Sequence, residues 1–275
     1  MRSIRESEAR SLPGLTTWSL KVPPPKRYKG LAENEHATMS WARRAGFDVP
    51  ETMVVPPERV EAVVDAPASP VFLIKRYDRT PEGPIHQEDI LQVTWLLSGW
   101  KYPHEPGEGF TGDSAAAGRR RLLTTHEGLA DIVQHLLGSS GVAEYLRRVV
   151  LEVATGNGDA HLKNWSFIYP DKKRPVWSPL YDQVSTLALQ QDKTLALPLY
   201  GVRNFKKIAM PHLTRLGVEH GLQRSDAEAL IDSTLSALHA TWNQGALYPV
   251  DHALRIRAHW RKCPLMANRT ELARP

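Results

Sequence analysis

The spacing of apolar residues changes near position 85, and this change limits the fold more than any other feature of the sequence. Before it, β-branched or aromatic runs alternate with proline-containing connections, a pattern that predicts strands over Thr17–Val22, Thr52–Val55 and Val71–Tyr77. Between the first two runs, Glu33–Ala45 has apolar residues at helical spacing and ends before Gly46. A small sheet with one helix is the simplest structure for this part of the chain.

After position 85 the spacing becomes helical. Thr124 and Glu127 form a capping box for a helix that runs to Leu137 and ends at Gly138. Further helices are expected at Gln87–Leu97, Val142–Thr155, Ser225–Trp242 and His252–Lys262. A hairpin is expected over Trp165–Tyr169 and Pro175–Trp177. A loop rich in glycine and proline is expected over Pro103–Gly118. We therefore expect an α+β protein with two lobes, a small β-rich lobe over residues 1–80 and a larger, mostly helical lobe over residues 81–275, with a ligand cleft between them.

Composition narrows the class of protein. The 275 residues are 41% hydrophobic and 24% charged, which is ordinary for a globular protein, and the net charge of +5 favours polyanionic ligands. Cys263 is the single cysteine, so an internal disulfide and a cysteine-rich zinc site are excluded. The polar stretch Met1–Leu12 does not resemble a signal peptide, and no apolar run of about 18 residues occurs. A cytoplasmic protein without membrane association is expected.

The densest group of polar residues is Gly156–Ser166, which follows a predicted helix and precedes a predicted strand. It contains Asp159, His161, Lys163 and Asn164, and a second carboxylate, Asp182, follows Asn164 by 18 positions. A hairpin of that length can return the chain to the same edge, so these side chains can face one site.

This set of side chains fits phosphoryl transfer, in which the protein contributes positioning and charge neutralisation. Asp159 is the candidate base that accepts the proton of the attacking hydroxyl. Asn164 and Asp182 offer the oxygen ligands that Mg²⁺ needs in addition to water and phosphate groups. Lys163 can neutralise charge on the transferred group. His161 is a further candidate catalytic residue of this loop, and it is expected to have a structural part there rather than to bind a metal, because no second histidine or cysteine is nearby.

Six blocks, in the same order, resemble the HipA-like serine/threonine kinase family. The loop from Asp159 to Asn164 matches its D-x-H-x-K-N motif, and Pro179–Thr186 resembles its P-x-Y-D-x-x-S-T block. The other blocks lie upstream: Trp18–Lys21, Asn34–Glu35, Lys75–Arg79 and His86–Asp89. The resemblance implies a protein-kinase-like fold in which Lys21 holds ATP phosphates, Glu35 pairs with Lys21, and the strand of Lys75 and Tyr77 meets adenine through backbone groups.

The resemblance also implies the activity and the partners. ATP and Mg²⁺ are the expected cofactors, and the substrate is a protein phosphorylated on serine or threonine. The expected role is the toxin of a toxin–antitoxin pair, in which the partner is a small antitoxin that binds DNA. The kinase itself is expected to be associated with DNA only through this antitoxin.

Two features depart from the family. The chain begins almost at the kinase core, so the usual N-terminal subdomain is expected to be absent or to be a separate accessory protein. Arg2–Thr16 contains only Gly14 where a glycine-containing phosphate loop is usual, and Ser3, Ser7 and Ser11 are the candidate autophosphorylation sites there.

Other interpretations stay open. Gly158–His161 resembles the G-D-x-H opening of metal-dependent phosphoesterases, although the further histidine block of that class does not occur and Leu162 replaces its usual glycine. A kinase-like module that binds nucleotide without transferring phosphate is a second alternative. Taken alone, Asp159 is an ordinary turn residue, and Lys21 with Glu35 can form a surface ion pair of under about 1 kcal/mol.

Overall fold

The computed structural model describes residues 17–23, 28–59, 69–103, 122–190, 193–242 and 244–267, and every structural statement below concerns these residues. Ser3, Ser7 and Ser11 lie outside them, as does all of the predicted loop Pro103–Gly118 except Pro103.

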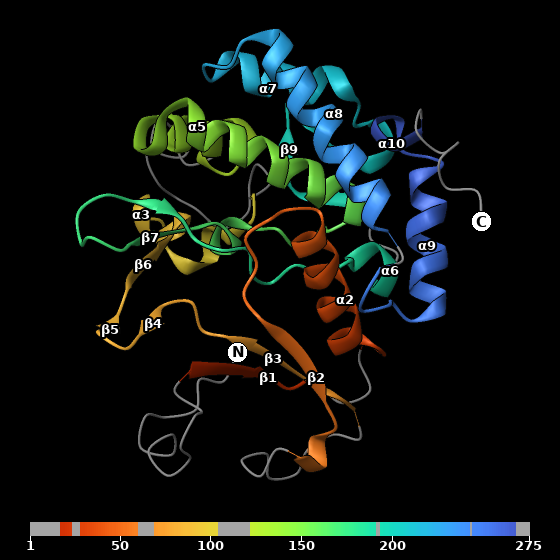
Figure 1. Ribbon diagram of the computed structural model, residues 1–275. Coiled ribbons are helices and arrows are strands. Elements are labelled where there is room, and N and C mark those ends of the chain that lie inside the picture. Colours follow the sequence, from red (N-terminus) through yellow and green to blue (C-terminus); the bar gives the residue numbers. More distant parts are fainter. Residues whose placement is uncertain are drawn as a thin grey trace.

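A three-stranded antiparallel sheet with one helix forms the first part of the chain, as predicted. Strands β1 (Trp18–Lys21) and β2 (Thr52–Val55) flank β3 (Val71–Lys75), which ends two residues earlier than expected. Helix α2 (Leu31–Arg44) packs against this sheet (Figure 1). It follows Gly30, whose φ of 76° is readily available only to glycine, and it ends before Gly46, whose φ is 86°.

Helix α2 also contacts the helical part of the molecule. The indole nitrogen of Trp41 donates a hydrogen bond to the carbonyl of Leu238 (2.9 Å), which lies in helix α8 (Arg224–Thr241). The side chain of Trp41 is 3% exposed. A buried aromatic residue that also satisfies its only donor fixes the helix at this point.

The predicted helix Gln87–Leu97 is wrong. His86–Asp89 is strand β6, which pairs with β7 (Ser166–Tyr169), and β7 pairs in turn with β8 (Val176–Trp177). The Asp89 carboxylate accepts the backbone N–H of Gln92 (2.9 Å), while the Gln92 side chain accepts the backbone N–H of Asp89 (2.9 Å). This capping box delays the helix to Ile90–Val93 (α3), and the left-handed φ of 55° at Trp95 follows its end.

Helix α5 (His126–Thr155) is the longest element and joins two predicted helices. It is interrupted at Gly138, where φ is 65° and ψ is −164°, so the predicted break is present although the two segments form one element. Most of the second segment is buried, and it packs against α8, α7 (Met210–Glu219) and β9 (Thr194–Leu199).

The remaining elements are short or lie near the C-terminal end. The sequence analysis did not anticipate α7, β9 or β10 (Val202–Asn204). Predicted helix His252–Lys262 is α9, with bounds Val250–Trp260. The others are β4 (Arg79–Thr80), β5 (Gly83–Pro84), α6 (Thr186–Gln190), α10 (Pro264–Ala267) and the 3₁₀ turns η2 (Pro57–Arg59), η3 (Ser98–Lys101), η4 (Leu162–Asn164) and η5 (Phe205–Lys207).

One hydrophobic cluster runs through the described residues, from Phe72 and Ile74 of the sheet to Leu146 of α5 and Trp260 of α9. In Figure 1 the β1–β3–β2 sheet lies at one end of the molecule, and α5, α7 and α8 lie at the other. The hairpin of β7 and β8 and the loops before and after it lie between these ends. None of the described helices is both long enough and apolar enough to cross a bilayer.

Candidate active site

The Asp159 loop, defined as residues 156–165, connects α5 to β7. Gly156 has a left-handed φ of 65°, and a Cβ at this position would lie 2.8 Å from the Cβ of Leu187. Any other residue would therefore be strained and crowded here. The backbone N–H of Gly158 donates to the hydroxyl of Thr186 (2.7 Å). The loop thus leaves the helix in a fixed direction and is attached to the segment that follows Asp182.

Hydrogen bonds within the loop hold the backbone of Asp159 on both sides. Its N–H donates to the side-chain oxygen of Asn157 (3.0 Å). Its carbonyl accepts from the backbone N–H of His161 (2.8 Å) and from the side-chain nitrogen of Asn164 (2.8 Å). The side-chain oxygen of Asn164 has no hydrogen bond in the described part of the chain. That oxygen is therefore available to a ligand such as a hard cation.

Lys21, Glu35 and Asp182 form one ionic cluster, although they come from three distant parts of the sequence. The Lys21 ammonium lies 2.5 Å from Glu35 Oε1 and also donates to Asp182 Oδ1. The side chains of Lys21, Glu35 and Asp182 are 25%, 6% and 38% exposed. The fully exposed surface ion pair considered from the sequence is therefore not what forms, because Glu35 is buried and Lys21 mostly so.

Two carboxylates share a single ammonium in this cluster, and the pKa values follow from that. Burial alone would lower the pKa of Lys21, but Glu35 and Asp182 raise it above its ordinary value. Burial raises the pKa of Glu35 from 4.5 to about 7, against the opposing effect of Lys21 and with a further increase from Asp182. Burial would also raise the pKa of Asp182, but Lys21 outweighs it and keeps that pKa below its ordinary value. Asp182 is thus the fully ionised member of the pair.

This arrangement predicts that the stability of the fold depends on pH because Glu35 titrates differently in the folded and the unfolded chain. Between about pH 4.5 and 7 the folded chain keeps a proton on Glu35 that the unfolded chain has lost, so the free energy of unfolding falls as the pH rises through this window. One unit of pKa corresponds to about 1.4 kcal/mol, so the fall is on the order of 3–4 kcal/mol. The pKa of Lys21 is shifted upwards and that of Asp182 downwards, so neither titrates in this window.

Glu35→Gln is expected to remove this part of the pH dependence. Urea unfolding of the wild type and the variant at several values between pH 5 and 8 measures the difference in the free energy of unfolding. The difference should decrease up to about pH 7 and then level off. Glu33→Gln, on the same helix but outside the cluster, is the control. Parallel curves for the wild type and Glu35→Gln would show that Glu35 is ionised throughout.

The segment around Asp182 is attached to both α2 and the Asp159 loop. Asn34, next to Glu35, accepts the backbone N–H of Ser185 with its side-chain oxygen (2.8 Å). The hydroxyl of Thr186 donates to the carbonyl of Gly156 (3.2 Å). Asp182 itself has a left-handed φ of 57°, which is uncommon for a residue other than glycine, asparagine or aspartate. These contacts fix the direction in which its carboxylate points.

His161 lies between the two parts of the site. Burial lowers its pKa, whereas the charges of Asp159 and Asp182 act to raise it. Both carboxylates are therefore close enough to interact with one imidazole. The side chain of His161 is largely buried, and its Nδ1 has no hydrogen-bond partner in the described regions. No hydrogen bond or ion pair joins Asn164 directly to Asp182 among the residues that are described.

The other predicted site residues are placed less centrally. The side chain of Lys163 is exposed, and its charge partly offsets the rise that burial causes in the pKa of Asp89. Lys75 ends β3, and its ammonium lies 3.6 Å from Glu51 at the surface. The ring of Tyr77 packs against that of Tyr181 (6.0 Å between centroids), directly before Asp182.

Tyr102 and Lys101 belong to the site, and the sequence analysis missed both. The Tyr102 hydroxyl donates to Asp159 Oδ1, and its ring packs edge-on against His161 (5.1 Å). The Lys101 ammonium lies over the Tyr102 ring (5.0 Å), and its charge lowers the pKa values of His161 and Asp182. The available signal was a basic and an aromatic residue beside the Pro103–Gly118 segment, which is too common a pattern to indicate a site.

Comparisons with known proteins identify the family of this chain. The family model of the HipA-like C-terminal domain matches residues 4–242. Two proteins of Sinorhizobium fredii that carry the name putative kinase, Y4dM and Y4mE, are 34% and 28% identical over 230 and 239 residues. Each alignment covers 82% of this chain but only 51% and 50% of the relative. The chain thus spans about half the length of these relatives.

Two solved structures have a similar fold. One is HipA of Shewanella oneidensis, from a complex of HipA, HipB and operator DNA, with a TM-score of 0.61 and 21% identity over 88% of this chain and 56% of that one. The other is the proinflammatory kinase CtkA of Helicobacter pylori, with a TM-score of 0.59 and 13% identity over 94% of this chain and 89% of that one. The family match over most of the sequence, together with these relatives, shows that the chain belongs to the HipA-like kinases.

Proposed function

We propose that this chain transfers the γ-phosphate of ATP to a serine or threonine hydroxyl of a protein. The observation that carries the proposal is the ionic cluster, in which Lys21 joins Glu35 of α2 to Asp182. The segment of Asp182 is bonded to the loop that holds Asp159, so candidate phosphate, metal and base groups are fixed relative to one another. We further propose that the sheet with α2 and the helical part act as two lobes around a nucleotide.

Each residue of the site has a distinct part in this proposal. Asp159 accepts the proton of the attacking hydroxyl, and Lys21 contacts the phosphates of the nucleotide. Asn164 and Asp182 fit Mg²⁺, because one amide oxygen without a hydrogen bond and one ionised, part-exposed carboxylate are the hard ligands it prefers. The bound ion would neutralise charge on the phosphate groups. Lys163, on the exposed side of the loop, is available to the protein substrate.

We also propose that the chain acts as the toxin of a toxin–antitoxin pair. The structural relative from Shewanella oneidensis was solved with HipB and operator DNA. By analogy, a small DNA-binding antitoxin is the partner we propose for this chain, and DNA is reached through that partner.

The test is incubation of the purified chain with γ-labelled ATP and Mg²⁺ in cell extract, followed by identification of the labelled protein by mass spectrometry. Label on serine or threonine of a distinct protein, lost when Mg²⁺ is chelated, is the expected result. Nucleotide binding with no transfer to any protein would instead support the non-enzymatic module.

Tyr102→Phe is expected to lower the turnover of phosphate transfer about tenfold to a hundredfold, with little change in ATP affinity. A carboxylate has two oxygens, and because Tyr102 bonds to Oδ1, we assign to Oδ2 the proton of the acceptor hydroxyl. Without that bond the base samples other rotamers, and misplacement by about 1 Å costs on the order of a hundredfold.

The phenylalanine keeps the ring against His161, so the variant tests the hydroxyl alone. Initial rates at saturating ATP, with a separate measurement of nucleotide affinity, distinguish the two effects. Tyr169→Phe, which removes a hydroxyl bonded to Glu88 (2.6 Å) on the neighbouring hairpin, is the matched control. Equal turnover for Tyr102→Phe and the wild type would mean that Tyr102 does not position the base.

A further inference from the structure

Lys101 is a positive charge of the site that has no negative partner. It ends the turn η3, directly before Tyr102, and its side chain is half-buried. Its ammonium makes no hydrogen bond and no ion pair with any residue that the structure describes, whereas the ammonium of Lys21 is shared by two carboxylates. A half-buried ammonium without a counter-charge attracts an anion from solution.

Packing places Lys101 beside the groups assigned to the base and the metal. The turn η3 packs against α3 and against η4, the turn that ends at Asn164. The Lys101 ammonium lies 5.0 Å from the centre of the Tyr102 ring, and the hydroxyl of that ring is bonded to Asp159. The turn that carries Lys101 therefore lies next to the loop that carries both Asp159 and Asn164.

The charge of Lys101 acts on two separate parts of the site. It lowers the pKa of His161, which belongs to the Asp159 loop, and it lowers the pKa of Asp182. One ammonium thus interacts both with the loop of the proposed base and with a proposed ligand of the metal. In an in-line transfer the γ-phosphoryl group lies between the base and the metal. Lys101 is therefore close to the place that this group must occupy.

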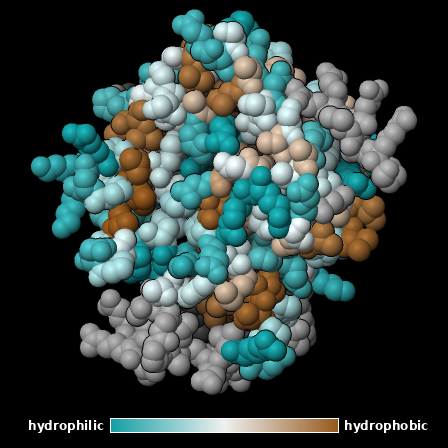
Figure 2. All heavy atoms as spheres, in the orientation of Figure 1, coloured by the Kyte–Doolittle hydropathy of each residue, from teal (hydrophilic) through white to brown (hydrophobic). Residues whose placement is uncertain are grey.

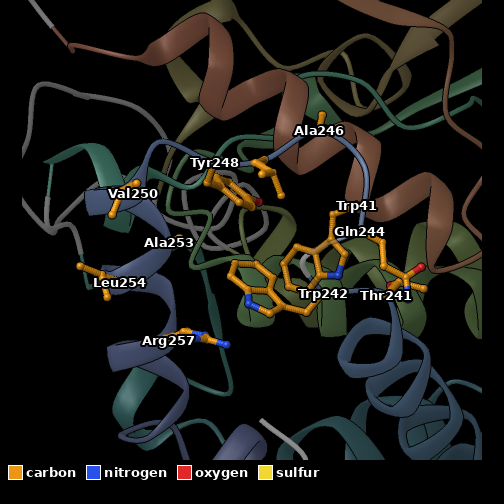
Figure 3. A pocket seen from close by; sticks show the side chains of 11 residues that line it. Trp41, Thr241, Trp242, Gln244, Ala246, Tyr248, Val250, Ala253, Leu254 and Arg257 are labelled. Carbon is orange, nitrogen blue, oxygen red and sulfur yellow. The ribbon is translucent and has the colours of Figure 1, made fainter. Parts of the chain in front are cut away.

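Other positive charges of the site are placed differently. Lys21 is already paired with Glu35 and Asp182, and the side chain of Lys163 is exposed. A cavity of about 260 Å³ beside α8 and α9 shares no residue with this group and is a separate feature of the fold (Figure 3). Lys101 is thus the half-buried lysine of the site whose charge remains available to a phosphate group.

We propose that Lys101 is a catalytic residue whose ammonium contacts the γ-phosphoryl group while it is transferred. The inference rests on the proposed function and adds to it the charge that the transferred group needs. The oxygen of the acceptor hydroxyl forms a bond to the γ-phosphorus, and the bond from this phosphorus to the β–γ bridging oxygen breaks. The hydroxyl proton goes to Asp159, and the bridging oxygen leaves on ADP with the electron pair of the broken bond. Lys101 gives up no proton and acts by charge alone.

Lys101→Met is expected to lower turnover about 10²–10³-fold, while the half-saturating concentrations of ATP and of acceptor protein stay near those of the wild type. Methionine keeps an apolar stem over the Tyr102 ring, so the variant removes the charge and little else. The measurement is the initial rate of protein labelling by γ-labelled ATP and Mg²⁺ in cell extract, at several concentrations of ATP and of extract. Label incorporated without the added chain is subtracted.

Lys173→Met is the matched control. Lys173 is exposed in the turn between β7 and β8. Figure 2 shows hydrophilic residues at the edge of the molecule where Figure 1 places this turn. The same chemical change at this position should leave turnover unaffected.

Chemical restoration of the ammonium separates charge from fold. Lys101→Cys should be as slow as Lys101→Met, and alkylation of the introduced thiol with 2-bromoethylamine should restore most of the turnover, because it rebuilds an ammonium on a side chain of similar length. Alkylation with iodoacetamide adds an uncharged amide and should restore nothing. The wild type, whose Cys263 is buried, is treated with both reagents as the control.

Four results would overturn the inference in a chain that transfers phosphate. Two are wild-type turnover in Lys101→Met and an effect on the half-saturating concentration of extract alone, which would assign Lys101 to binding of the protein substrate. The third is a loss of turnover that 2-bromoethylamine does not restore. The fourth is a double variant, Lys101→Met with Tyr102→Phe, that is no slower than Tyr102→Phe, because Lys101 would then act only through Tyr102.

Failure of the proposed function gives a different result. If the wild type labels no protein, the proposed function is wrong and this inference is wrong with it. If the wild type labels protein and one of the four results above is found, only the role of Lys101 is wrong.

Discussion

Asp159→Asn is expected to lower the rate of phosphate transfer about 10²–10⁴-fold, while the affinity for ATP stays near that of the wild type. Asparagine has the shape of aspartate but cannot accept the proton of the attacking hydroxyl. The backbone bonds of residue 159 to Asn157, His161 and Asn164 do not involve its carboxylate, so the loop should keep its conformation. Single-turnover transfer from γ-labelled ATP, with nucleotide affinity measured separately, gives both quantities.

Asp171→Asn is the matched control for this experiment. Asp171 is exposed in the turn between β7 and β8, where its carboxylate accepts two backbone N–H groups, from Lys173 and Arg174. The same chemical change there should leave transfer unaffected. If Asp159→Asn autophosphorylates at the wild-type rate, Asp159 is not the base. A loss of ATP binding would instead indicate that the substitution had disturbed the fold of the loop.

Asp182→Ala is expected to weaken binding of Mg·ATP by at least about thirtyfold and to lower transfer as well. The variant removes the ionised, part-exposed carboxylate that we assign to the metal, and a thirtyfold loss of affinity corresponds to about 2 kcal/mol. It also leaves Lys21 paired with Glu35 alone. Titration of transfer activity with Mg²⁺ at fixed ATP should show a higher requirement for the metal.

Asp182→Asn separates charge from backbone conformation. The left-handed φ of 57° at this position is tolerated by asparagine but strained by about 1–2 kcal/mol for alanine. If charge is what matters, the Mg²⁺ requirement rises to a similar degree in both variants, and only the alanine variant loses stability as well. An unchanged Mg²⁺ requirement in Asp182→Asn would exclude Asp182 as a ligand of the metal.

The β1–β3–β2 sheet and helix α2 were predictable because these elements are marked locally. Proline-bounded β-branched runs indicated the strands, and Gly46 indicated the end of α2. The helix predicted over Gln87–Leu97 failed because apolar spacing in a short window does not distinguish a strand followed by one helical turn from a longer helix. What decided the structure was the pairing of His86–Asp89 with Ser166–Tyr169, about 80 residues away.

The candidate site was predictable where its residues lie in one loop and not where they come from several. Asp159, His161 and Asn164 are neighbours in the sequence, so their proximity follows from the chain itself. The contact of Lys21 with Asp182 joins positions 161 residues apart, and only the resemblance to a family indicated that Lys21 belongs to the site. Tyr102 had neither signal, since a single aromatic residue in a connection is usually a packing residue.

Helix α2 is held at two places along its length, near its start by the bonds of Asn34 to Ser185 and of Glu35 to Lys21, and near its end by the bond of Trp41 to Leu238. A rotation or outward swing that separated Glu35 from Lys21 would also have to break the other two bonds and expose a buried indole. The pair of Lys21 and Glu35 is thus already formed in the free chain, and helix α2 keeps one position instead of swinging in and out. Control of this molecule by a partner would then act on access to the site rather than on its assembly.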